Sequence, residues 1–148
     1  MEIALEECKP LTPFRTSYKQ SRVLARQKSI EFTFNCKEED AAALAQCSIH
    51  LDPTRFEQVM RNLLTNAFKF TPERGSVRMV VSKVTRNLEG SLQQQQQQQC
   101  VRLEVVDSGA GISKENQTKL FGQYVQFDAN KLQKGGGSGL GLWICKGE

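Results

Sequence analysis

The feature that most constrains the fold is an aspartate followed by two glycines directly after an alternating apolar segment. Residues 101–106 alternate valine and leucine with charged residues, which predicts a strand with one buried face. Asp107 ends this strand, and Gly109 and Gly111 follow it. Glycines let the backbone approach a ligand such as a nucleotide, because no side chain intervenes. An ordinary turn after a strand has the same composition, so other segments must decide between the two interpretations.

The segment 52–70 carries the signals of a complete helix. Asp52 and Pro53 suit the N-cap and the first helical position, and Thr71-Pro72 predicts the end of the helix. The apolar residues with helical spacing, which predict the buried face, are Phe56, Val59, Met60, Leu63, Leu64 and Ala67.

Polar residues at helical spacing border that buried face. Asn62, Asn66 and Lys69 stand at i, i+4 and i+7, so they form one stripe about 100° from the centre of the apolar face. Asparagine oxygens suit a hard cation such as Mg²⁺, and a lysine suits a phosphate. The alternative is two solvated asparagines and a lysine that compensates the helix dipole.

A glycine-rich loop near the end of the chain is a third candidate. Residues 135–141 read Gly-Gly-Gly-Ser-Gly-Leu-Gly and lead into an apolar segment that predicts a helix start. The free N–H groups of such a loop and the positive end of a helix dipole suit an anion. Alone, this loop is equally well interpreted as a flexible linker.

The rest of the chain predicts an alternation of strands and helices. The expected elements are a strand within 2–8, a helix from Phe14 to about Ile30, and strands at 30–34, 47–51 and 76–84. Pro10 and Pro13 are expected to interrupt the chain before that first helix, and residues 37–46 are ambiguous. Seven glutamines (93–99) predict a flexible, Gln-rich hairpin loop over 87–100, since a polar homopolymer has nothing to bury.

Composition excludes several classes of protein. The 148 residues suit one domain (1–148), and a 39% hydrophobic, 24% charged composition is typical of a globular protein. A net charge of +4 does not suggest nucleic-acid binding, and no apolar run reaches the ~20 residues of a membrane span. We therefore expect a cytoplasmic domain, whose parent protein can still be membrane-anchored. The five cysteines lack metal-ligand spacing, and His50, the only histidine, is expected to be an ordinary strand residue.

Four motifs, in this order and spacing, closely resemble those of the ATP-binding catalytic domain of sensor histidine kinases. They are an asparagine box (62–72), a first glycine box (107–112), a phenylalanine box (120–127) and a second glycine box (137–142). The resemblance runs from about Pro13 to Lys146. It implies a two-layer α/β sandwich of the Bergerat type, in which helices cover one face of a mixed sheet. The two C-terminal strands of the family fold are missing, so we expect a piece of a larger multidomain kinase.

The resemblance also implies roles for single residues. Asn66, assisted by Asn62, would hold Mg²⁺, and Lys69 would reach the phosphates of ATP. Phe70 would lie near the base, and Asp107 would accept the adenine amino group. The remaining residues implied to bind the nucleotide are Gly109, Gly111 and Ile112 in the adenine pocket, and Gly137, Gly139, Leu140 and Gly141 at the phosphates. Residues 128–138 would form a lid, to which Lys131 and Lys134 add charge.

The implied activity is transfer of the γ-phosphoryl group of ATP to a histidine on a separate dimerisation domain, and from there to a response regulator receiver domain. ATP-hydrolysing relatives carry a glutamate as general base four residues before the metal-binding asparagine. Asn62 occupies that position here. A neutral amide cannot take a proton from water, which argues for transfer and against hydrolysis. The alternatives are a degenerate interaction module and a hydrolytic ATPase of the same superfamily.

Overall fold

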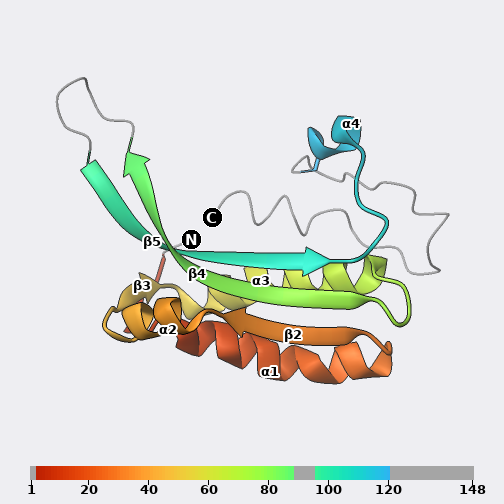
Figure 1. Cartoon of the computed structure of the whole chain (residues 1–148), viewed down its shortest axis with the longest axis horizontal. Coiled ribbons are helices and arrows are strands. Elements are labelled where there is room, and N and C mark those ends of the chain that lie inside the picture. The colour runs from red at the N-terminus through yellow and green to blue at the C-terminus, as the bar shows by residue number, and fades with distance from the viewer. Residues whose placement is uncertain (1–2, 89–95, 121–148) are drawn as a thin grey trace.

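The computed structural model describes residues 3–88 and 96–120 (Figure 1). The described elements in chain order are β1 (Glu6–Cys8), α1 (Leu11–Gln27), β2 (Glu31–Cys36), α2 (Glu38–Ala45), β3 (Ile49–Leu51), α3 (Pro53–Phe70), β4 (Ser76–Leu88), β5 (Gln96–Asp107) and α4 (Lys114–Gln117).

The main sheet is mixed, with the strand order β2-β4-β5. β2 and β4 are parallel, so the crossover between them carries α2, β3 and α3. β4 and β5 are antiparallel neighbours, and β1 pairs with β3 in a small separate ladder. The helices α1 and α3 pack on one face of the main sheet, as Figure 1 shows. The fold class expected from the sequence is confirmed.

The core lies between this helical layer and the sheet. Val77, Met79 and Val81 of β4 are almost fully buried, while Arg78 between them is exposed, as the alternation predicts. The buried side chains that face them from the helices are Phe14, Ala25, Leu44, Met60, Leu64, Ala67 and Phe68. Phe68 also meets the Phe32 ring edge-on, with ring centroids 5.0 Å apart. The core thus fixes α3 against the sheet.

The prediction for the start of the first helix is wrong. α1 begins at Leu11, Pro10 is its N-cap, and Pro13 lies inside its first turn. The N–H groups of a first turn have no helical acceptor, so a proline there removes no hydrogen bond. The helix ends at Gln27, earlier than expected, and Ser29 has a positive φ of 53° that the helix cannot accommodate.

The β4–β5 hairpin is longer than the sequence pattern predicts. Its ladder extends to the pair Leu88 and Gln96, well inside the segment 87–100 for which we expected a loop. Four residues of the glutamine run, 96–99, belong to β5. Cross-strand pairing, which a polar homopolymer does not reveal, decides the conformation here. Residues 89–95 lie outside the described residues.

The ambiguous segment 37–46 contains α2, and the strand expected at 47–51 is β3. His50 is exposed on β3 and pairs with Glu7 of β1. The four described cysteines, Cys8, Cys36, Cys47 and Cys100, are partly buried free thiols. None of the described helices is long and apolar enough to cross a membrane.

Candidate nucleotide site

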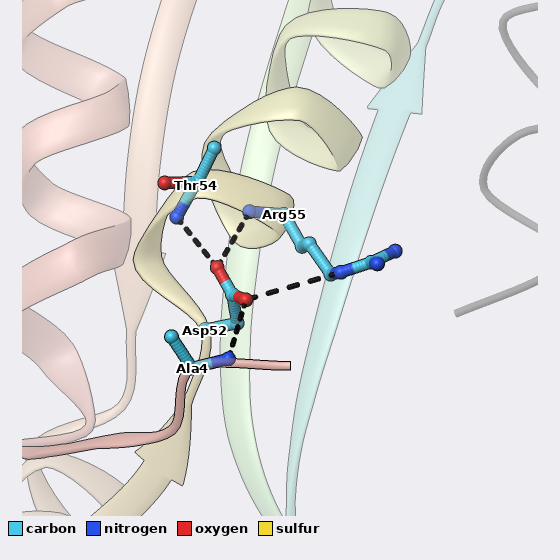
Figure 2. A network of polar contacts seen from close by, with 4 residues as sticks. All are labelled: Ala4, Asp52, Thr54 and Arg55. Carbon is cyan, nitrogen blue, oxygen red and sulfur yellow. Dashed lines mark hydrogen bonds and ion pairs between the residues drawn. The ribbon is translucent and has the colours of Figure 1, made fainter. Parts of the chain in front are cut away.

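α3 is the element that carries the candidate polar residues, and Asp52 fixes its start. One oxygen of the Asp52 carboxylate accepts hydrogen bonds from the backbone N–H groups of Thr54 (3.0 Å) and Arg55 (3.1 Å). The other accepts from the backbone N–H of Ala4 (3.0 Å), as Figure 2 shows. The bonds from Arg55 and Ala4 lower the pKa of the Asp52 carboxyl, because they favour its charged form. The cap therefore joins the N-terminal segment to α3.

The stripe on α3 lies where the sequence places it. Met60 and Leu64 are buried in the core, whereas Asn62, Asn66 and Lys69 are each half-buried at its border. Side chains at such a border keep polar atoms near solvent while their positions are fixed by the packed face.

The end of α3 is held against the beginning of β4 by a tight turn. Thr71 is the C-cap, and the backbone N–H of Gly75 donates to the carbonyl of Pro72 (3.0 Å). A side chain at Gly75 would lie 2.5 Å from Thr71 Cγ2 and 2.9 Å from Ser108 Oγ, so only glycine fits. This turn therefore brings the helix end to the residues that follow β5.

Two hydrogen bonds, one between backbones and one to a side chain, join the end of β5 to the start of β4. The N–H of Ser108 donates to the carbonyl of Ser76 (3.0 Å), and the N–H of Ser76 donates to Ser108 Oγ (2.9 Å). Asp107, directly before this pair, stands opposite Val77. These two bonds fix the position at which Asp107 leaves the sheet.

The turn after Asp107 packs directly on the end of α3. The N–H of Gly109 donates to Asp107 Oδ1 (2.9 Å), which orients the carboxylate. A Cβ atom on Gly109 would stand 2.6 Å from the main-chain oxygen of Phe70 and 2.7 Å from Asp107 Oδ1. The two sequence features, a helix with asparagines and an aspartate flanked by glycines, therefore meet at one end of the molecule (Figure 1).

Two apolar side chains are exposed around this meeting point. Phe70 is 41% exposed and Ile112 is 44% exposed. Lys69 Nζ lies 5.4 Å from the centroid of the Phe70 ring. Gly111 has a φ of +72°, a conformation that glycine adopts without strain. Lys69 and Phe70 thus lie together at the end of α3, beside the turn that follows Asp107.

The described side chains offer few ligands for a metal ion. No group of three or more His, Cys, Asp or Glu side chains within residues 3–88 and 96–120 is placed to hold a metal ion. The two asparagines provide oxygen donors, which suit Mg²⁺, but amides alone leave most of its coordination shell to other ligands. Phosphate oxygens of a nucleotide supply such ligands, so the residues fit a metal that arrives with its nucleotide.

A pocket of about 290 Å³ lies elsewhere, between α1 and α3. Leu24, Met60 and Phe68 contribute to its lining, and none of the predicted site residues does. It is therefore distinct from the meeting point of α3 and β5.

Part of the expected site falls outside the described residues. These are the phenylalanine box beyond Leu120, the lid at 128–138 with Lys131 and Lys134, and Gly137, Gly139, Leu140 and Gly141. Sequence reasoning missed the parts played by Gly75 and Ser108. A glycine shortly after the helix end was the available signal for Gly75, but no local pattern reveals the bond from Ser76 to Ser108.

Comparison with known proteins identifies the family of this chain. The profile of the family described as "Histidine kinase-, DNA gyrase B-, and HSP90-like ATPase" matches residues 51–147. The chain belongs to this ATPase family. Within this family, it is 43% identical over 98 residues to the sensor protein EvgS of Escherichia coli strain K12. It is 32% identical over 126 residues to hybrid signal transduction histidine kinase D of Dictyostelium discoideum.

These alignments cover 66% and 84% of this chain, and only 7% of either relative. The ATPase domain also resembles solved structures. The catalytic domain of histidine kinase ThkA matches with a TM-score of 0.69 and 25% identity, covering 99% of this chain and 78% of that one. Full-length ShkA in complex with AMPPNP matches with a TM-score of 0.68 and 25% identity, covering 99% of this chain and 26% of that one.

The predictions of family and fold are therefore confirmed. Because the curated relatives are sensor kinases, this ATPase-family chain is a catalytic ATP-binding domain of the histidine kinase type.

Proposed function

We propose that this domain binds Mg-ATP where α3 meets the turn after β5, and donates the γ-phosphoryl group to a histidine on a separate dimerisation domain. The observation that supports the proposal is the close approach of Gly109 to the Phe70 carbonyl, because it sets the end of α3, the helix that carries Asn62, Asn66 and Lys69, beside the turn that follows Asp107. The complex of ShkA with AMPPNP, an ATP analogue, supports a nucleotide as the ligand.

The adenine end of the site is assigned to β5 and its turn. Gly109 already donates to Asp107 Oδ1, so the other carboxylate oxygen, Oδ2, would accept from the adenine amino group. Guanine has a carbonyl at the corresponding position, which cannot donate, so Asp107 would select adenine. Phe70 and Ile112 would cover the base, and Gly111 would shape the pocket.

The phosphate end is assigned to α3. Asn66 and Asn62 would hold Mg²⁺, and Lys69 would move from the Phe70 ring to the phosphates. The bound ion would neutralise phosphate charge and orient the transferred group. Gly137, Gly139, Leu140 and Gly141 are proposed to close on the triphosphate with the lid at 128–138.

The chemistry proposed for this chain is positioning without a general base. Asn62 occupies the place where hydrolytic relatives carry a glutamate, so water at the γ-phosphate would not be activated. The nucleophile would be a histidine imidazole, brought by the dimerisation domain, and a response regulator receiver domain would accept the phosphoryl group next. ThkA, whose catalytic domain this chain resembles, forms a complex with the response regulator protein TrrA.

The test supplies the missing acceptor. The chain is mixed with labelled ATP, Mg²⁺ and a histidine-bearing helical hairpin from a related sensor kinase, and label on the hairpin is measured. We expect labelled hairpin, loss of the label when the acceptor histidine is replaced, and no label on the chain alone. Steady release of phosphate without an acceptor would support the hydrolytic ATPase instead, and a folded chain without nucleotide binding would support the interaction module.

A further inference from the structure

The side chain of Lys69 covers the ring of the next residue in the chain. Lys69 stands in the last turn of α3 and is half-buried. Its ammonium group lies over the Phe70 ring, with Nζ 5.4 Å from the ring centroid, which is within the range of a cation–π interaction. Phe70 itself is one of the exposed large apolar residues. The free chain therefore places a cation of its own on an exposed aromatic ring.

The two residues have separate parts in the proposed nucleotide site, and the inference below rests on that proposed function. Phe70 would pack against the base, whereas Lys69 would bind a phosphate. Lys69 belongs to the stripe with Asn62 and Asn66, so it covers the ring on the side of this stripe. A ligand whose base takes the same side of the ring has to displace the ammonium group first.

We propose that Lys69 makes the site selective for phosphorylated nucleotides over nucleosides, because it covers the Phe70 ring until a phosphate draws its ammonium group away. A ligand that breaks an existing contact loses the free energy of that contact. ATP replaces the cation–π contact with an ion pair between a phosphate and Lys69. Adenosine carries the same base but no phosphate, so it breaks the contact and gains nothing from Lys69. One side chain thus weakens nucleoside binding and strengthens nucleotide binding.

The cation–π contact is weak enough for a nucleotide to break. At a partly exposed site, such a contact favours the covered ring by about two- to fivefold. A charge-assisted bond from an ammonium group to a phosphate favours binding by at least about tenfold. The product of the two factors is the selectivity assigned to Lys69, about 20-fold or more.

Lys69→Ala tests the proposal, and Lys28→Ala is its matched control. Lys28 also brings a cation to the last turn of α3, where its Nζ donates to the Phe68 carbonyl (3.4 Å), but the side chain of Phe68 is buried in the core. Each variant therefore loses one positive charge at the same helix end. Adenosine and a non-hydrolysable ATP analogue with Mg²⁺ are titrated into each chain.

Lys69→Ala should bind adenosine about two- to fivefold more tightly and the ATP analogue at least about tenfold more weakly. Lys28→Ala should keep the ratio of the two affinities of the unchanged chain. Phe70→Leu keeps an apolar side chain but offers no ring to the cation. In the Phe70→Leu background, Lys69→Ala should therefore no longer strengthen adenosine binding, although it should still weaken binding of the analogue.

The unchanged chain gives a second readout that depends on no variant at Lys69. The ring current of Phe70 should shift the NMR signals of the Lys69 methylene group next to Nζ upfield, relative to the Phe70→Leu chain. Adenosine and the ATP analogue should both remove this shift. An unshifted signal in the free chain, or a shift that persists with adenosine bound, would overturn the proposal.

The outcomes separate this inference from the proposed function. If the analogue binds but adenosine binds no more tightly to Lys69→Ala than to the unchanged chain, the selectivity assigned to Lys69 is overturned and the nucleotide site stands. An equal gain in adenosine affinity in the Phe70→Leu background would also overturn it, because the ring would then play no part. No binding of the analogue by the folded, unchanged chain would overturn the proposed function and this inference with it.

Discussion

Gly109 and Phe70 are separated by 38 residues in sequence, yet the α-carbon of one lies against the main-chain oxygen of the other. A methyl group on Gly109 would stand 2.6 Å from that oxygen, closer than real Cβ atoms come to an oxygen. We predict that Gly109→Ala pushes the Asp107 turn off the end of α3. The free energy of unfolding should fall by about 1–3 kcal/mol, and affinity for an ATP analogue should fall with it. Thermal unfolding and calorimetry would measure both quantities, and no change in either would show that the contact is not required.

The two hydrogen bonds between Ser76 and Ser108 lead to a second prediction. Ser108→Ala removes the acceptor of the Ser76 N–H but keeps the backbone bond, so it should cost about 1 kcal/mol. Ser82→Ala is the control, because this serine lies on β4, the strand of Ser76, and makes no side-chain hydrogen bond within the described part of the chain. Urea unfolding should separate the two variants; equal midpoints would argue against the role given to Ser108.

Asp52 predicts a specific dependence on pH. Hydrogen bonds from Arg55 and Ala4 lower its pKa in the folded chain, so the charged carboxylate adds stability above the ordinary carboxyl pKa of about 3.9. That contribution should disappear as the pH falls through the lowered value. Asp52→Asn does not titrate, so the difference in stability between the two chains should be constant near neutral pH and shrink in acid. A difference that stays constant in acid would contradict the lowered pKa.

The parts of the fold that local signals control were predictable. Asp52, Pro53 and Thr71 set the ends of α3. The spacing of its apolar residues correctly identified Met60, Leu64 and Ala67 as buried but missed Phe68, and the other predicted members of the buried face, Phe56, Val59 and Leu63, are only partly buried. The start of α1 was not predictable from prolines alone, since Pro13 interrupts a helix in its interior but not in its first turn.

The remaining differences come from contacts between distant segments. The glutamines at 96–99 have no alternation of apolar residues, and they become a strand because β4 pairs with them. The candidate site was likewise predictable only where local sequence determines it. Its stripe on α3 was visible in the sequence, but the fit of Gly109 against Phe70 depends on how two elements pack.

A substitution at Asn62 tests whether the lack of a general base is what prevents hydrolysis of ATP. Asn62→Glu would place a carboxylate where hydrolytic relatives have their general base, so water could lose a proton to it. We predict measurable release of phosphate from Mg-ATP by this variant and weaker labelling of an added acceptor hairpin. Asn62→Gln is the control, because glutamine has the length of the introduced glutamate but carries a neutral amide. Equal phosphate release from both variants would remove the explanation based on a general base.

The central claim is that α3 and the turn after β5 bind one adenine nucleotide together. Calorimetric titration with Mg²⁺ and a non-hydrolysable ATP analogue tests it in the unchanged chain, in Asp107→Asn and in Asn66→Ala. We predict that Asp107→Asn loses about 10- to 100-fold in affinity with or without Mg²⁺, through a lost charge-assisted hydrogen bond. Asn66→Ala should lose affinity only when Mg²⁺ is present. Unchanged binding by Asp107→Asn in a folded chain would contradict the account.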